Sequence, residues 1–88
     1  MIERELIVGN QLGLHARATA RLVQLLSGYA CSATLVAKGR EVNAKSIMGV
    51  MLLAAGRGTR VLLRVSGEDE QACADAAAGL FERHFDEA

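Results

Sequence analysis

The sequence predicts an α+β domain, an open-faced sandwich in which a four-stranded antiparallel sheet carries three helices on one face. Segments of alternating polarity and segments of helical periodicity follow one another in the order βαββαβα. A Lys38-Gly39 pair between two of the strand segments suits a tight hairpin turn, which joins antiparallel neighbours. The chain has 88 residues, of which 51% are hydrophobic, so we expect one packed domain over residues 1–88.

The first strand and the first helix are each indicated by the spacing of apolar residues. Residues 2–8 alternate as a strand does, with Glu3 and Glu5 facing water and Arg4 breaking the inward series. Residues 16–27 have helical spacing, and Gly28 is the expected stop because glycine tolerates the left-handed conformation there. The residues expected to face the core are Ile2, Leu6 and Val8 in the strand and Ala18, Thr19, Leu22, Val23 and Leu26 in the helix.

The middle of the chain predicts a hairpin followed by a short helix. Residues 31–37 form a strand, and residues 40–44 form a short return strand that is polar enough to lie at an edge of the sheet. Ser46 is placed to begin the helix, and Gly56 is the expected stop.

Residues 59–67 give the strongest strand pattern of the chain. Val61, Leu63 and Val65 point one way along it. The acidic run at 68–70 then opens a last helix, since negative charge suits the positive end of a helix dipole. Its expected buried stripe is Ala76, Ala77, Leu80 and Phe81, and His84 is an expected exposed residue near its end.

Charge and cysteine content exclude several classes of protein. Ten basic and ten acidic side chains give no net charge, which argues against a general binder of nucleic acid or membranes. Cys31 and Cys73 stand apart from any metal-ligand spacing, so we expect buried reduced thiols, no metal and no cofactor. The charged N-terminus and the lack of a membrane-length apolar run predict a cytoplasmic protein.

His15 lies where the first helix begins, in the segment GLHAR. The first N–H groups of a helix have no internal partner and favour negative charge, so they disfavour a protonated imidazole and could hold a phosphoryl group bound to the ring. Arg17 adds a planar set of donors for phosphate oxygens. From spacing alone, an incidental surface histidine is the more frequent explanation of this pattern.

The segments GLHARATARLV and NAKSIMGVMLLAAGRG together resemble the HPr family, the histidine phosphocarriers of the bacterial phosphotransferase system. The resemblance covers essentially the whole chain. It implies that His15 accepts a phosphoryl group on Nδ1 from enzyme I, which phosphoenolpyruvate charges, and passes it to an enzyme IIA domain with the help of Arg17. Such a protein is a carrier and not an enzyme. Family members commonly have proline where this chain has Ala18, and alanine, a strong helix former, can replace that local preference.

The second helix raises two further expectations. Ser46 is expected to cap it, and in some HPr proteins the matching serine is phosphorylated by a dedicated HPr kinase/phosphorylase. The helix has almost no polar side, so we expect part of it to be exposed for docking, while Val50 and Leu53 join the core. The resemblance assigns partner contacts to residues matching Ile47, Met48 and Met51. Arg21 could extend a basic rim around the site, although solvated side chains are the simpler expectation for it and for Lys45.

Several alternatives remain open at this point. The carrier could serve sugar uptake or a nitrogen-related relay of the NPr type, which the ending HFDEA resembles. A protein-interaction module with an incidental His15 is a second class. An RNA-binding domain lacks aromatic strand residues and basic charge here, and a hydrolase lacks a convincing acid or base partner for His15. A carrier that presents one face to successive partners is expected to be a monomer.

Overall fold

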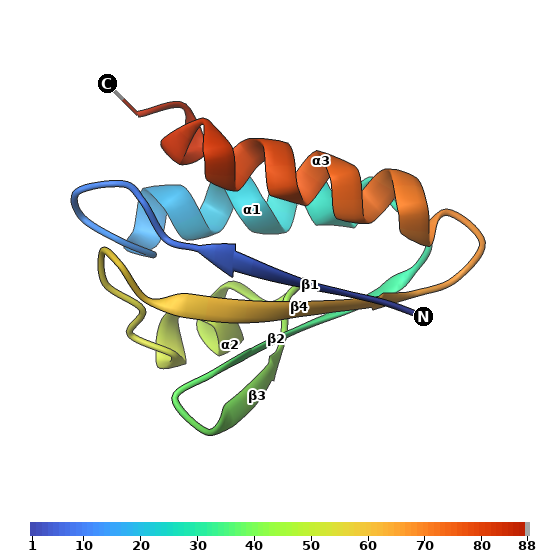
Figure 1. Ribbon diagram of the computed structural model, residues 1–88, viewed down its shortest axis with the longest axis horizontal. Helices are drawn as coiled ribbons and strands as arrows, with labels where there is room; N and C mark the ends of the chain where they lie inside the picture. The colour runs from blue at the N-terminus through green and yellow to red at the C-terminus, as the bar shows by residue number, and fades with distance from the viewer. Residues whose placement is uncertain (88) are drawn as a thin grey trace.

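The computed structural model describes residues 1–87 and confirms the predicted fold class. Four antiparallel strands form one sheet in the order β1-β4-β2-β3. Helices α1 and α3 run side by side along the molecule, and α2 packs against α1 and β3 (Figure 1). The elements are β1 Ile2–Ile7, α1 Ala16–Ser27, β2 Ser32–Ala37, β3 Arg40–Asn43, α2 Ile47–Leu52, β4 Arg60–Ser66, α3 Glu70–Glu82 and the 3₁₀ turn η1 His84–Asp86. None of these helices is both long and apolar enough to cross a membrane.

Strand β4 lies between β1 and β2, and its alternation sets the two faces of the sheet. Leu63 is fully buried and pairs with Arg4 on one side and Leu35 on the other. On the opposite face, Arg64 forms ion pairs with Glu3 at 2.6 Å and Glu41 at 2.7 Å. Because a one-residue slip would exchange the two faces, this alternation fixes the register. The polar strand β3 is at the edge, as predicted.

The core lies between the sheet and the helices. Most of the predicted core positions are buried, but Ile2, Val23 and Ala76 are only half-buried. Small side chains line the inner face of α3, where they allow the helix to approach β1 and α1 closely. The buried residues of the helices are Ala18, Thr19, Leu22 and Leu26 in α1, Val50 in α2, and Cys73, Ala74, Ala77, Ala78, Leu80 and Phe81 in α3.

The helix ends differ from the predicted ones. Gly28 has φ −77°, so α1 ends in a right-handed turn and not in the expected left-handed residue. Helix α2 stops at Leu52, four residues before Gly56, and Ala54 takes the left-handed conformation at φ 48°. Lys38 of the hairpin donates a hydrogen bond at 2.8 Å to the carbonyl oxygen of Ala54, the residue after the C-cap Leu53. Cationic side chains commonly satisfy the carbonyl groups at a helix C-terminus.

Two charged residues near the sheet also have more specific partners than the sequence indicated. Arg4, which interrupts the inward series of β1, forms an ion pair with Asp75 of α3 at 3.0 Å. Asp69 precedes α3, but its carboxylate makes no hydrogen bond within that helix. It accepts instead from the N–H groups of Ala30 at 2.7 Å and Cys31 at 2.9 Å, and so connects α3 to the start of β2.

These contacts predict an acid-sensitive part of the stability. The hydrogen bond from Ala30 holds the pKa of Asp69 below its usual value, with a smaller contribution from the Cys31 N–H group. A carboxyl group whose pKa is lower in the folded state stabilises the fold above its unfolded pKa of about 4, and this stability is lost as the pH falls through the folded pKa. We expect Asp69→Asn to lower the urea midpoint at pH 7 and to flatten its decline below pH 4. Urea titrations from pH 2 to pH 7 measure this, with the exposed Glu68→Gln as control, and an acid decline as steep as in the unmodified chain would contradict it.

Candidate functional site

The loop before α1 places His15 by a close contact with the loop that follows α2. Gly13 has φ +69°, and a Cβ atom on it would lie 2.5 Å from the carbonyl oxygen of Ala55. The N–H group of Leu14 donates a hydrogen bond to this same oxygen at 2.8 Å. Only glycine fits both the backbone conformation and the contact. His15 then caps α1 with an extended backbone, at φ −74° and ψ −179°.

Both ring nitrogens of His15 have a hydrogen-bond partner. Nδ1 accepts from the N–H group of Arg17 at 3.3 Å, at the N-terminus of α1. Nε2 lies 2.6 Å from Oε2 of Glu87. Since Nδ1 is the acceptor, Nε2 carries the proton and donates to the carboxylate. The lone pair of Nδ1 therefore faces the N–H group of Arg17 at the start of the helix, and the side chain is 28% exposed.

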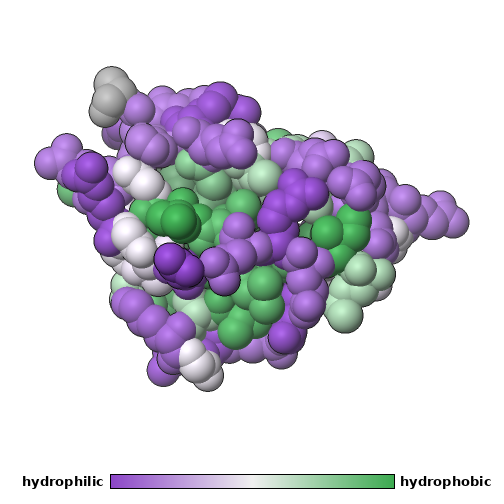
Figure 2. Space-filling view, viewed as in Figure 1, coloured by the Kyte–Doolittle hydropathy of each residue, from purple (hydrophilic) through white to green (hydrophobic). Residues whose placement is uncertain are grey.

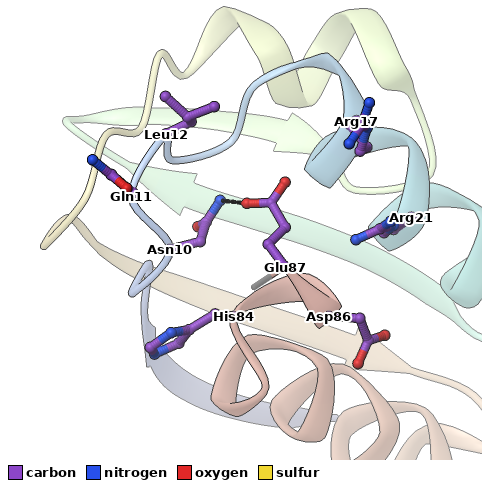
Figure 3. A pocket seen from close by; sticks show the side chains of 8 residues that line it. All are labelled: Asn10, Gln11, Leu12, Arg17, Arg21, His84, Asp86 and Glu87. Atoms are coloured by element: carbon purple, nitrogen blue, oxygen red, sulfur yellow. Dashed lines mark hydrogen bonds between the residues drawn. The ribbon is translucent and has the colours of Figure 1, made fainter.

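A cleft of about 370 Å³ is lined in part by Glu87, the hydrogen-bond partner of this ring (Figure 3). Arg17 and Arg21 line it from successive turns of α1, and Asn10 faces them from the loop after β1. Arg17 is exposed, so its guanidinium is available to a group that enters the cleft from solvent. Arg21 is half-buried and donates a hydrogen bond to the carbonyl oxygen of Phe85, so the expectation of a solvated arginine is wrong.

Glu87 and Asn10 were missed as site residues by sequence reasoning. Oε1 of Glu87 accepts a hydrogen bond from Nδ2 of Asn10 at 2.8 Å. This bond, followed by smaller contributions from His15 and Arg21, holds the pKa of Glu87 below its usual value. The expectation that His15 lacks an acid or base partner is therefore wrong. Glu87 and His15 are 72 positions apart, and no local pattern in the sequence connects them.

Comparison with known proteins decides the family. A family model described as "PTS HPr component phosphorylation site" matches residues 2–83. The chain belongs to the HPr family. It is 61% identical to phosphocarrier protein HPr of Xylella fastidiosa strain 9a5c over 99% of this chain and 98% of that protein, and 37% identical to phosphocarrier protein NPr of Shewanella violacea over 99% and 96%.

Solved HPr structures have the same fold. The crystal structure of HPr-C-His from Thermoanaerobacter tengcongensis has a TM-score of 0.96 and 38% identity, and it covers 100% of this chain and 99% of that chain. Another structure from this organism, described as an HPr dimer, has a TM-score of 0.79 and 40% identity over 85% and 86% of the two chains. Members of the HPr family are phosphocarriers, so this chain is a carrier and not a catalytic enzyme.

The second motif of this HPr chain forms a capped helix with an exposed apolar side. Oγ of Ser46 accepts a hydrogen bond from the N–H group of Gly49 at 3.1 Å, which confirms its capping role. Val50 and Leu53 are buried, as predicted. The remaining large side chains form what we call the α2 patch: Ile47 is 45% exposed, Met48 77%, Met51 43% and Leu52 62%. Figure 2 shows one face of the molecule, on which apolar surface lies between polar side chains.

The other candidate groups of this HPr chain have structural partners. Lys45 donates from Nζ to the carbonyl oxygen of Tyr29 at 2.7 Å, so it is not simply solvated. Cys31 and Cys73 are free and buried, and burial raises the pKa of the Cys73 thiol to about 12, which makes it unreactive. Within residues 1–87 no group of three or more metal-ligating side chains comes together.

Proposed function

We propose that the chain is a phosphocarrier that accepts a phosphoryl group on Nδ1 of His15 from enzyme I, which phosphoenolpyruvate charges, and passes it to an enzyme IIA domain. The observation that carries this proposal is the lone pair of Nδ1, which lies at the N-terminus of α1 while Nε2 is occupied by Glu87. In the transfer, this lone pair forms a bond to phosphorus, and the bond between phosphorus and the donor group of enzyme I breaks. The proton stays on Nε2 throughout.

The surroundings of Nδ1 suit the phosphoryl group that would be bound there. The N–H group of Arg17 in the first turn of α1 points toward it, and helix N-termini bind anions in this way. Arg17 lines the cleft and is exposed. Its guanidinium adds a fixed positive charge and up to five hydrogen-bond donors. We assign Arg17 to stabilising the phosphoryl oxygens, and Arg21 to the basic rim that faces a partner.

The α2 patch is proposed as the docking surface for enzyme I and the enzyme IIA domain. Its exposed methionines suit a surface that must accept more than one partner, because their side chains adapt to different shapes. Ser46 lies at the start of this helix, so a phosphate added there by an HPr kinase/phosphorylase would place negative charge beside the docking surface. We assign this regulatory role to Ser46 in addition to its capping role.

The sugar-uptake branch is the first choice for this carrier. The 61% identity to an HPr protein exceeds the 37% identity to an NPr protein, and NPr-like nitrogen signalling is the alternative. We also propose that the chain works as a cytoplasmic monomer, since each partner in turn must reach His15. Sedimentation of the purified protein tests the monomer, and a panel of enzyme IIA acceptors from both branches tests the assignment.

The central experiment is phosphorylation with enzyme I and labelled phosphoenolpyruvate. The proposal requires an acid-labile, base-stable phosphate that peptide mapping places on His15. The label must then move to an added enzyme IIA domain. A label at another residue, or no label at all, would overturn the proposed function.

The α2 patch gives a separate prediction. Met48→Glu is expected to raise the KM for transfer from enzyme I by roughly tenfold, because it places a charge in an apolar interface. The free energy of unfolding should change by less than about 0.5 kcal/mol, since the side chain is 77% exposed. Ile7→Glu is the matched control, as Ile7 is an exposed apolar residue of β1 outside the patch. Equal effects of the two substitutions on KM would rule out a docking role for the patch.

A further inference from the structure

We propose that Asn10 and Glu87 form a hydrogen-bonded chain with His15, in which Asn10 orients Glu87 and Glu87 fixes the proton of the ring on Nε2. In this scheme Glu87 also balances the positive charge that the ring acquires when Nδ1 binds phosphorus. Both are positioning residues, since they act through His15. The part that concerns the proton applies to the unphosphorylated protein, whereas the part that concerns charge rests on the proposed function.

Glu87 uses both of its carboxylate oxygens. Oε1 accepts from Asn10 at 2.8 Å, and Oε2 accepts from Nε2 of His15 at 2.6 Å. The side chain is only 19% exposed, so water competes weakly for these positions. A carboxylate accepts at both oxygens, whereas the amide of a glutamine accepts at one and donates at the other. This position therefore requires an acid.

Asn10 uses its amide as a double donor. Nδ2 donates to the carbonyl oxygen of Gly13 at 2.7 Å as well as to Glu87, so one amide group connects the loop that carries His15 to the carboxylate that holds the ring. The residue is 2% exposed, and its Oδ1 atom is buried without a hydrogen-bond partner. A buried unpaired acceptor is unfavourable, and sites that keep one often have a functional reason. Here the two donated bonds supply that reason.

The backbone of the C-terminal turn is strained in a way that brings Glu87 to the ring. His84, Phe85 and Asp86 have φ values of 53°, 58° and 59°, which are unfavourable for side chains other than glycine. Two contacts hold this turn in place: the ring of Phe85 is fully buried, and its carbonyl oxygen accepts from Arg21. Figure 3 shows the result, in which Glu87 extends from the turn toward Asn10 between the loop and α1. Such strain is typical of functional sites.

Other charged groups border the same cleft. These are Arg17 and Arg21 from α1 and His84 and Asp86 from the turn. Asp86 is paired with Arg83 at 2.8 Å, so Glu87 is the carboxylate that is hydrogen bonded to the ring within residues 1–87. Arg21 faces Glu87 and adds to the factors that hold it ionised.

The hydrogen bonds that connect Asn10, Glu87 and His15 have a direct consequence for phosphoryl transfer. When Nδ1 uses its lone pair to bind phosphorus, the ring becomes a cation with its proton still on Nε2. When phosphorus leaves for the next acceptor, the electron pair of the bond returns to Nδ1 and the ring is neutral again. A carboxylate on Nε2–H lowers the energy of the cationic form, as the aspartate does for the histidine of a serine protease triad.

The test begins with the unphosphorylated protein and ¹⁵N NMR of the His15 ring. The unmodified chain should show the neutral Nε2–H tautomer with slow exchange of that proton. Glu87→Gln and Asn10→Asp should each speed this exchange by roughly tenfold, a typical effect for loss of one charge-assisted hydrogen bond. Asp86→Asn is the matched control, because it removes a carboxylate from the same turn without touching the ring. Exchange in Glu87→Gln that is as slow as in Asp86→Asn would overturn the proposal.

A second measurement separates this proposal from the proposed function. Transfer of the phosphoryl group from enzyme I to Glu87→Gln should be roughly tenfold slower than transfer to Asp86→Asn, at equal thermal stability, because the cationic ring that forms lacks its carboxylate. Equal transfer rates would disprove the role in charge balance, even where the exchange of the Nε2 proton is faster. A label outside His15 would overturn the proposed function, while the NMR comparison would still decide whether Asn10 and Glu87 fix the proton.

Discussion

Replacing His15 with alanine is expected to reduce phosphoryl uptake from enzyme I to the background of the assay. The substitution removes the one ring whose Nδ1 lone pair lies at the N-terminus of α1, and an acyl phosphate formed on Glu87 instead would be labile to base, unlike phosphohistidine. Uptake of labelled phosphate, read from an acid-labile fraction, measures the effect.

The same substitution should affect stability only moderately. It removes the side chain that caps α1, and loss of a capping side chain costs about 0.5–2 kcal/mol. The hydrogen bond between the cap and Arg17 is 3.3 Å long, so we expect a value near the lower limit. Thermal unfolding of the variant measures this change in stability. A variant that remains folded at the assay temperature shows that the loss of uptake comes from the missing ring and not from unfolding.

His84→Ala is the control for this experiment. His84 is the second histidine of the chain, is exposed, and borders the same cleft. Its removal should leave uptake close to that of the unmodified chain. Residual acid-labile label on His15→Ala, or its loss from His84→Ala, would move the acceptor to the other ring and contradict the assignment of His15.

Features that depend on nearby residues were predictable from the sequence. The alternation in β4, the helical spacing of α1 and the capping position of Ser46 all express contacts within a few residues. The position of His15 at the start of α1 was predictable for the same reason, whereas its role as a phosphoryl acceptor came from the resemblance to the HPr family and stays a prediction. The exposure of the α2 patch also followed from the sequence, since an 88-residue domain has too little core to bury a helix on every side.

Features that depend on the C-terminal turn were not predictable. His84 was expected near the end of the last helix, but α3 stops at Glu82 and His84 has a left-handed backbone. No glycine marks this change of direction. Phe85 enforces it, because its ring is buried and its carbonyl oxygen accepts a hydrogen bond from Arg21, which is 64 positions away. The contacts of Glu87 with Asn10 and His15 depend on this turn, so neither could be seen from local spacing.

Phe85→Ala should therefore have the largest effect on stability of any substitution near the site. The ring is fully buried and lies 4.8 Å from that of Phe81 between centroids, at an angle of 58°. Removing a buried phenylalanine ring costs about 3–5 kcal/mol, and each kcal/mol lowers the Tm of a domain of this size by roughly 4–8 °C. Urea or thermal unfolding measures this loss.

Phe85→Ala also separates the contribution of the turn to stability from its positioning of Glu87. The variant lacks the buried ring that holds the three left-handed residues in place. At a temperature where the variant is still folded, the turn should open, Glu87 should leave the ring, and exchange of the Nε2 proton should become as fast as in Glu87→Gln. Phe85→Leu keeps an apolar anchor and should recover much of both properties. If Phe85→Ala lowered the Tm while the Nε2 proton remained protected, then Glu87 would be held by Asn10 alone, and the buried ring would stabilise the fold without positioning the site.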